Sequence, residues 1–231
     1  MRALVLSSGG LDSTTCVGIA VDKYGAKNVT TASIIYGQKH VKEIESSEKV
    51  AQFYGLKHIV LDLSEIFKHS DCSLLTHSSK CIEHKSYAEQ TAESENGRVQ
   101  TYVPFRNGLL LSTAAALADS LYPNEDVVIY YGAHADDAAG RAYADCSPEF
   151  AQAMNEAIQI GTYEKIKVEA PLINMNKAEV VKTGIGLGVP FQLTWSCYEG
   201  GEKQCGTCGT CIDRKNAFRA NNIEDPVAYE K

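Results

Sequence analysis

The chain has 231 residues, 44% of them hydrophobic, which supplies enough apolar surface for one sizeable core and too little length for two full domains. Asp and Glu outnumber Lys and Arg by 29 to 22, giving a formal net charge of −7, and this balance argues against nucleic-acid binding. The longest apolar runs are far shorter than the ~20 residues of a membrane helix, and the stretch after Arg2 is too short for a signal peptide. We therefore expect a cytoplasmic protein, with residues 1–231 in one domain, that binds neither nucleic acid nor a membrane.

The first sixty residues alternate between short apolar runs and amphipathic segments. The pattern predicts strands at Arg2–Leu6, Val29–Ile35 and His58–Leu61, with helices at Ser13–Tyr24 and Val41–Tyr54 between them. Such alternation is typical of an α/β fold. We expect a Rossmann-like parallel sheet flanked by helices.

From residue 63 to 101 the periodicity fades, and Ser, His and Glu become frequent. We interpret this segment as an irregular insertion or lid within the domain. It contains His69, Cys72, His77, Cys81 and His84. Their spacing matches no familiar metal-binding pattern, so a polar excursion is favoured over a second metal site.

The strand and helix rhythm resumes after this insertion. It predicts a helix at Asn107–Leu121, a strand at Val127–Tyr131, and helices at Phe150–Ile160 and Lys177–Leu187. A cysteine-rich stretch, Cys197–Cys211, follows.

The segment Ser8-Gly9-Gly10-Leu11-Asp12-Ser13 separates the first predicted strand from the first predicted helix. Amide groups at a helix start point outward and the helix dipole favours an anion there, so a phosphate group would fit. Asp12 would either cap the helix or help to hold Mg²⁺ between phosphates. An ordinary glycine turn capped by Asp12 is the alternative. The chain lacks the Gly-x-x-x-x-Gly-Lys-Ser/Thr motif, so a Walker-type ATPase is not supported.

Four of the eight cysteines, Cys197, Cys205, Cys208 and Cys211, are spaced so that their thiolates can meet at one tetrahedral centre. In a protein of the reducing cytoplasm this spacing indicates a metal rather than disulfides. An iron–sulfur cluster is the rival, and zinc is preferred. Because four protein sulfurs leave zinc no open position, we expect one structural Zn²⁺ per chain in a small C-terminal zinc-binding segment, residues 195–215.

The string Ser-Gly-Gly-x-Asp-Ser after the first strand resembles the pyrophosphate (PP) loop of the N-type ATP pyrophosphatase superfamily, whose members split ATP into AMP and pyrophosphate. Further strings narrow the resemblance. The chain is similar to the 7-cyano-7-deazaguanine synthase family of queuosine biosynthesis over nearly its whole length. The strings that carry this likeness are Tyr36-Gly37-Gln38-Lys39-His40, Val103-Pro104-Phe105-Arg106-Asn107, Asp145-Cys146 with Glu149-Phe150, and Trp195-Ser196-Cys197-Tyr198.

The resemblance implies a carbon–nitrogen ligase that converts 7-carboxy-7-deazaguanine and ammonia to 7-cyano-7-deazaguanine. The family chemistry passes through an adenylated acid and an adenylated amide, and each activation releases AMP and pyrophosphate. An enzyme that stops at the amide, or that adenylates tRNA, is the alternative within the superfamily. The alternative outside it is a zinc-stabilised nucleotide-binding module without catalysis.

The resemblance also implies ATP as co-substrate, with Mg²⁺, at the PP-loop. The residues implied to bind ATP are Leu6, Ser7, Ser8, Gly9, Gly10, Leu11, Asp12, Ser13, Thr14, Thr15 and Cys16. Those expected to act in catalysis are Asp12, Ser13, Arg106 and Lys177. The candidates to bind the deazaguanine ring are Asp137, Asp145, Glu149, Phe105, Tyr143 and Trp195, because carboxylates accept its N–H groups and aromatic rings cover its face. We expect a homodimer, since symmetric dimers are common.

Overall fold

The computed structural model describes residues 1–94, 99–138 and 143–230. Its centre is a five-stranded sheet in the order β3-β2-β1-β4-β5, in which every neighbouring pair is parallel. The strands are β1 (Arg2–Leu6), β2 (Val29–Ile35), β3 (Lys57–Asp62), β4 (Val127–Tyr130) and β5 (Ile166–Glu169). The predicted parallel sheet is therefore confirmed.

Strand β1 lies in the middle of the sheet, where Leu4 is in register with Thr30 of β2 on one side and Ile129 of β4 on the other. The chain builds the sheet outward from β1 to β3, then returns across β1 to add β4 and β5. In such sheets ligands bind beyond the carboxyl ends of the strands, where the strand order reverses. The fold therefore places a binding crevice between the ends of β1 and β4.

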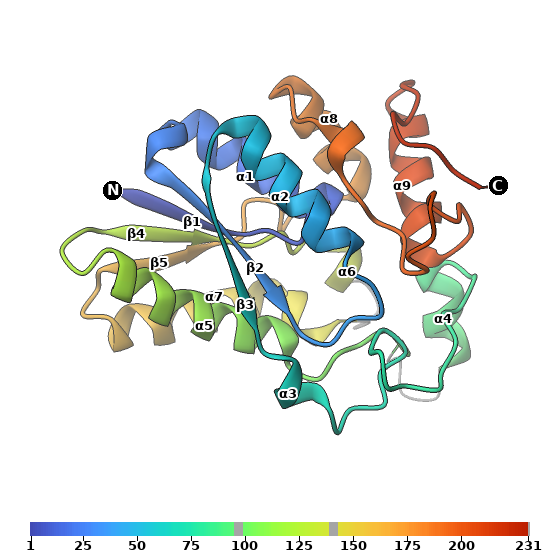
Figure 1. Cartoon of the computed structure of the whole chain (residues 1–231), viewed down its shortest axis with the longest axis horizontal. Coiled ribbons are helices and arrows are strands. Elements are labelled where there is room, and N and C mark those ends of the chain that lie inside the picture. Colours follow the sequence, from blue (N-terminus) through green and yellow to red (C-terminus); the bar gives the residue numbers. More distant parts are fainter. Residues whose placement is uncertain (95–98, 139–142, 231) are drawn as a thin grey trace.

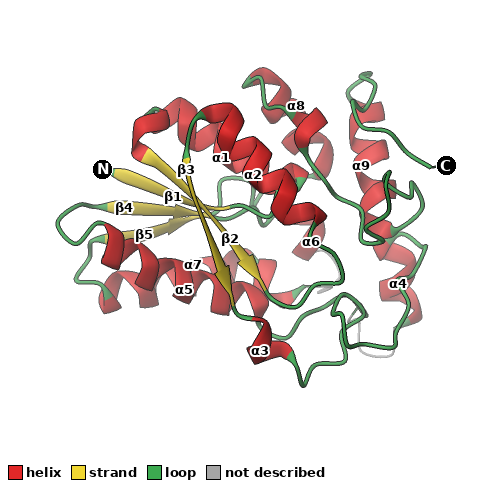
Figure 2. Cartoon of the chain, viewed as in Figure 1, coloured by secondary structure: helices red, strands yellow, loops and turns green. Residues whose placement is uncertain are grey.

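Helices cover both faces of the sheet (Figure 1). The longer ones are α1 (Leu11–Tyr24), α2 (Lys42–Tyr54), α5 (Arg106–Leu121), α7 (Pro148–Gly161), α8 (Lys177–Gly186) and α9 (Gly209–Ala220). Short helices are α3 (Ser64–Phe67), α4 (Tyr87–Glu93) and α6 (Ala135–Ala138). Helices α1 and α2 lie on one face and α5 and α7 on the other, while α9 stands beyond the carboxyl ends of the strands (Figure 2).

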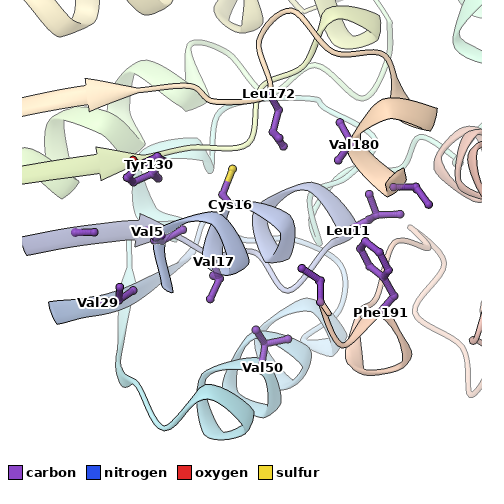
Figure 3. Close-up of a cluster of buried hydrophobic side chains, with 14 of the residues drawn as sticks. Val5, Leu11, Cys16, Val17, Val29, Val50, Tyr130, Leu172, Val180 and Phe191 are labelled. Carbon is purple, nitrogen blue, oxygen red and sulfur yellow. The ribbon is translucent and has the colours of Figure 1, made fainter. Parts of the chain in front are cut away.

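Each face of the sheet buries its own apolar cluster. On the α1 side, Val5, Val17 and Val50 meet Val180 of α8 and Phe191 (Figure 3). The opposite cluster joins Leu4 and Ile129 of the sheet to α5 and α7. Burying one such side chain contributes about 1.5–3 kcal/mol, so these clusters hold the helix layers on the sheet.

The structure adds elements that the sequence pattern did not predict. Strand β5 and helix α9 were missed, and the segment from 63 to 101 contains α3 and α4. A third apolar cluster packs this segment, through Phe67, Leu75 and Ile82, against the four cysteines of the C-terminal part. Among the described helices, none combines the length and the apolarity that crossing a bilayer requires.

Candidate active site

One cavity opens at the carboxyl ends of the strands. Its wall combines the segment after β1, the ends of β2 and β4, and residues from α2, α5, α8 and α9. Sequence segments far apart in the chain therefore meet where a doubly wound sheet binds its ligands.

The PP-loop, residues 8–13, is held by hydrogen bonds within the loop. The Ser8 amide donates to Ser13 Oγ at 3.1 Å, the two serine hydroxyls lie 3.1 Å apart, and the Gly10 amide donates to Ser8 Oγ at 3.3 Å. Gly10 precedes α1, and no side chain among the described residues caps this helix. Asp12 is thus not a capping residue, although its carboxylate lies in the first turn of α1, where a negative charge interacts favourably with the helix dipole. The start of α1 faces the cavity.

Gly9 brings the loop into close contact with α2. Its φ is +77°, and a Cβ there would lie 2.2 Å from the Glu43 carbonyl oxygen and 2.5 Å from the Ser47 nitrogen. Only glycine fits a positive φ at this separation. Of the residues predicted to bind ATP, Leu6–Ser8 and Gly10–Ser13 line the cavity. Thr14, Thr15 and Cys16 are instead buried within α1.

Asp12 faces a cluster of ionisable side chains from α8, α6 and the segment after β4. Lys177 Nζ lies 2.6 Å from Asp12 Oδ2 and 3.1 Å from His134 Nε2. His134 Nε2 lies 3.3 Å from Asp137 Oδ2 and 3.8 Å from Asp12 Oδ1. The structure thus brings predicted residues Asp12 and Lys177 together across a sequence separation of 165 positions.

The electrostatics of this cluster keep its central pair ionised. Burial alone would raise the pKa of Asp12, but Lys177 and His134 hold it below its ordinary value. Burial would likewise lower the pKa of Lys177, and Asp12 and Asp137 raise it instead. Asp137 lacks a lysine partner as close, and burial raises its pKa.

Arg106 lines the cavity from the start of α5. Its guanidinium carbon lies 5.4 Å from the centre of the Tyr36 ring, a cation–π distance. Glu43, on the first turn of α2, also lines the cavity. Burial raises the pKa of the Glu43 carboxyl to about 7, partly opposed by Arg106.

Glu43 should make stability depend on pH. Because its pKa is raised in the folded state, that state binds more protons than the unfolded chain, so stability falls as pH rises towards about 7. The free energy of unfolding of a Glu43→Gln variant is expected to exceed that of the wild type by about 1–3 kcal/mol at pH 8, and by less at pH 5. Urea unfolding at both pH values measures this. Glu45→Gln, an exposed change on the same helix, serves as control; an equal gain at both pH values for Glu43→Gln would contradict the prediction.

The residues predicted to bind the ring divide into two groups. Asp137, Tyr143 and Trp195 line the cavity. The remaining three do not line it: Phe105 is 56% exposed, Glu149 is exposed, and Asp145 is buried. The backbone amide of Asn107 donates to Asp145 Oδ2 at 2.9 Å, so this carboxylate anchors the start of α5.

The four cysteines of the C-terminal segment come together as predicted. All are buried, and their sulfurs lie within 4.8 Å of one another, with Cys205 and Cys211 at 4.0 Å. The Cys205 amide donates to Cys197 Sγ and the Cys208 amide to Cys205 Sγ, both at 3.3 Å, as suits thiolate acceptors. A tetrahedral ion with metal–sulfur bonds of about 2.3 Å needs sulfurs about 3.8 Å apart, so the site fits a metal of zinc's size.

The second group of histidines and cysteines does not form such a centre. In the described residues, the quartet is the one group of three or more Cys, His or carboxylate side chains whose ligand atoms come close enough to share a metal. His77 contacts the Ser70 carbonyl at 2.7 Å, and His84 lies 2.7 Å from Thr207 Oγ1 and 3.0 Å from Glu199 Oε1. His84 instead links the segment from 63 to 101 to the cysteine-rich loop.

Among the cavity residues that the sequence analysis missed are the ionisable side chains of Glu43, His134 and Asp213. Burial raises the pKa of Asp213 to about 6. His134 follows the end of β4, and polar residues after a parallel strand point to the binding crevice. That position was the available signal for His134, whereas Glu43 and Asp213 reach the cavity from helices with no motif.

A family model described as queuosine biosynthesis protein QueC matches residues 2–222. The chain belongs to the QueC family. It is 41% identical to the 7-cyano-7-deazaguanine synthase of Caldicellulosiruptor saccharolyticus over 100% of this chain and 96% of that protein. The 7-cyano-7-deazaguanine synthases of Archaeoglobus fulgidus and Thermoplasma volcanium are 40% and 42% identical, each over 100% of this chain and 91% of the relative. The predicted family and the prediction of an enzyme are confirmed.

The fold of the QueC chain also resembles that of a solved structure. NMN synthetase from Francisella tularensis matches with a TM-score of 0.51 and 13% identity, covering 96% of this chain and 78% of that one. At this identity the match concerns the fold alone, and it agrees with the predicted α/β architecture.

Proposed function

We propose that the chain is a 7-cyano-7-deazaguanine synthase, an ATP-dependent carbon–nitrogen ligase acting on 7-carboxy-7-deazaguanine and ammonia. The observation that carries the proposal is the Asp12–Lys177 pair, which joins a partly buried cation to the PP-loop inside the cavity. An anion bound there would meet a helix start and a lysine at once. The relatives that bear this name over the whole chain support the same product.

The proposed reaction activates one oxygen at a time. A carboxylate oxygen of the substrate attacks the α-phosphorus of ATP and pyrophosphate leaves. Ammonia then displaces AMP and forms the amide. The amide oxygen attacks the α-phosphorus of a second ATP, and loss of AMP together with the remaining N–H protons gives the nitrile. Each round turns a poor oxygen leaving group into a good one.

The PP-loop would hold the departing pyrophosphate through the hydroxyls of Ser8 and Ser13 and the amides at the start of α1. These donors are organised before the substrate arrives, and such groups lower a barrier most where negative charge builds. Lys177 would neutralise charge on the phosphates, and we assign the same task to Arg106, which lines the cavity from α5.

The carboxylates around the loop suit Mg²⁺. Asp12 Oδ1 is buried and accepts no hydrogen bond from the described residues, so it has a lone pair to offer. Asp12, with Asp137 or Asp213, would hold the ion. When bound, Mg²⁺ would neutralise the charge of the phosphate oxygens.

The deazaguanine ring would lie against the residues of the predicted set that line the cavity. Asp137 can accept N–H groups of the guanine edge, and Tyr143 and Trp195 present aromatic rings. Zn²⁺ would be held by the four cysteines within residues 195–215, where it would stabilise the C-terminal segment. The proposal keeps residues 1–231 as one adenylating domain, with 63–101 as its insertion or lid.

Lys177→Met should lower the rate of AMP formation by about 10²-fold, because it removes the cation beside Asp12 while keeping the length of the side chain. Loss of Lys177 should also raise the pKa of Asp12, since this lysine opposes the effect of burial. If ionised Asp12 is required, the acid limb of the pH–rate profile moves to higher pH. Steady-state rates across pH measure both effects. Lys182→Met, exposed on the same helix, should behave like the wild type, and an unshifted Lys177→Met profile would refute the coupling.

The test of the proposed function is incubation with 7-carboxy-7-deazaguanine, ammonia and Mg-ATP, followed by mass analysis. The expected result is conversion of acid to nitrile through the amide. Accumulation of the amide alone would favour an enzyme that stops there. AMP formation with tRNA but not with this acid would assign the chain to the tRNA-adenylating alternative, and absence of any AMP would leave a nucleotide-binding module.

The proposal includes a cytoplasmic homodimer that binds no nucleic acid. Light scattering during size-exclusion chromatography would measure the mass in solution. Cell fractionation and a tRNA-binding assay would test the other two statements.

A further inference from the structure

Arg214, on α9, is fully buried, and every donor of its guanidinium is used. Nε and Nη2 donate to the two carboxylate oxygens of Asp225 at 2.8 and 2.9 Å, and Nη2 also donates to the Phe191 carbonyl at 3.2 Å. Nη1 donates to Thr194 Oγ1 at 2.6 Å and to Ser196 Oγ at 3.2 Å. A planar fork with five bonded donors holds its partners in one arrangement.

The two hydroxyl partners of Arg214 flank Trp195, and Trp195 touches the PP-loop. The Trp195 amide donates to the Gly9 carbonyl at 2.9 Å. A second contact from α9 reinforces this segment, since Thr210 Oγ1 donates to the Ser196 carbonyl at 2.7 Å. Residues 194–196 are therefore fixed by α9 on one side and hold the loop on the other.

The Gly9 carbonyl matters because it belongs to the peptide plane that carries the Gly10 amide. In a trans peptide the C=O and N–H bonds point in opposite directions. Bonding of the carbonyl to Trp195 directs the Gly10 N–H the other way, towards Ser8 Oγ at 3.3 Å. Gly9 has a φ of +77°, and glycine tolerates other backbone angles equally well. Without the Trp195 contact this peptide could rotate and withdraw its donor from a bound phosphate.

We propose that Arg214 is a positioning residue of the PP-loop, which sets the affinity for ATP and pyrophosphate by fixing residues 194–196. This inference rests on the proposed function, since it assumes that the loop binds phosphates. Helix α9 carries Cys211 one turn before Arg214, so the cysteine centre and the loop are attached to the same helix. Arg214 itself does not line the cavity, and it reaches the wall only through its partner Ser196.

The test compares variants for binding of inorganic pyrophosphate and Mg-ATP by isothermal titration calorimetry. Arg214→Lys keeps the charge for Asp225 but cannot reach five acceptors, and it should raise both dissociation constants about tenfold. Thr194→Val keeps the volume and the Arg214–Asp225 pair, and should act in the same direction. Thr194→Ser restores the hydroxyl and should bind like the wild type. Arg219→Lys, the same change at an exposed position of α9, is the control.

Metal content and steady-state kinetics separate positioning from a general structural role. The KM for ATP should rise in Arg214→Lys and Thr194→Val, while the KM for the acid and the metal content stay within twofold of wild type. Equal rises in both KM values, or unchanged binding, would overturn the role of Arg214 and leave the proposed function standing. If the wild type binds neither pyrophosphate nor Mg-ATP, the proposed function fails and this inference with it.

Discussion

An Asp12→Asn variant is expected to form AMP about 10²- to 10³-fold more slowly than the wild type, with its fold unchanged. The asparagine has the same shape but loses the charge that lies 2.6 Å from Lys177. Asparagine keeps one oxygen, which must face the Lys177 donor, so its NH2 group replaces the buried oxygen that the described residues leave without a hydrogen-bond donor and that we assign to Mg²⁺. AMP release measured by chromatography, with circular dichroism to check the fold, gives the comparison.

Asp22→Asn makes the same chemical change at the exposed end of α1. It should retain wild-type turnover, because it lies at the opposite end of the helix from the PP-loop. AMP release by Asp12→Asn at a rate close to that of wild type would remove Asp12 from the catalytic residues.

Cys208→Ser is expected to lose the bound metal and to lower the melting temperature by at least about 10 °C. The sulfurs of the quartet lie within 4.8 Å of one another in a buried centre, so three remaining thiolates would be crowded without an ion to neutralise them. The loop that carries Cys197 and Cys205 would then lose its link to α9, which begins directly after Cys208. Elemental analysis and thermal unfolding measure the two effects.

Cys81→Ser, an exposed cysteine outside the quartet, should keep both metal and stability. Wild-type metal content in Cys208→Ser would contradict the assigned ligands. If the wild type contains iron and acid-labile sulfide, the quartet holds an iron–sulfur cluster and the assignment of zinc is wrong.

The buried strands of the sheet were predictable because their apolar runs are short and bounded by turns. Strands β1 and β2 have the predicted bounds. Strand β5 was missed because Lys167 and Glu169 interrupt its apolar residues, as an edge strand allows. Helix α9 was missed because it starts inside the cysteine quartet, where metal spacing hides the helical period.

The candidate site was predictable where a local motif carries it. The PP-loop and the quartet are each contiguous enough for their spacing to indicate their chemistry. The partnership of Lys177 with Asp12 required the fold, because α8 reaches the loop only after the sheet is assembled. His134 and Glu43 have no motif, and their importance follows from burial beside other charged groups. Tertiary packing therefore supplied the electrostatics that sequence spacing could not.

The most direct measurement follows the oxygen atoms of the substrate. The protein is incubated with Mg-ATP, ammonia and 7-carboxy-7-deazaguanine labelled with ¹⁸O at both carboxylate oxygens, and the nucleotides are analysed by mass spectrometry. Adenylation of the acid and then of the amide predicts two AMP per nitrile, each carrying one ¹⁸O, together with pyrophosphate. Unlabelled AMP, or ADP and orthophosphate as the products, would contradict it.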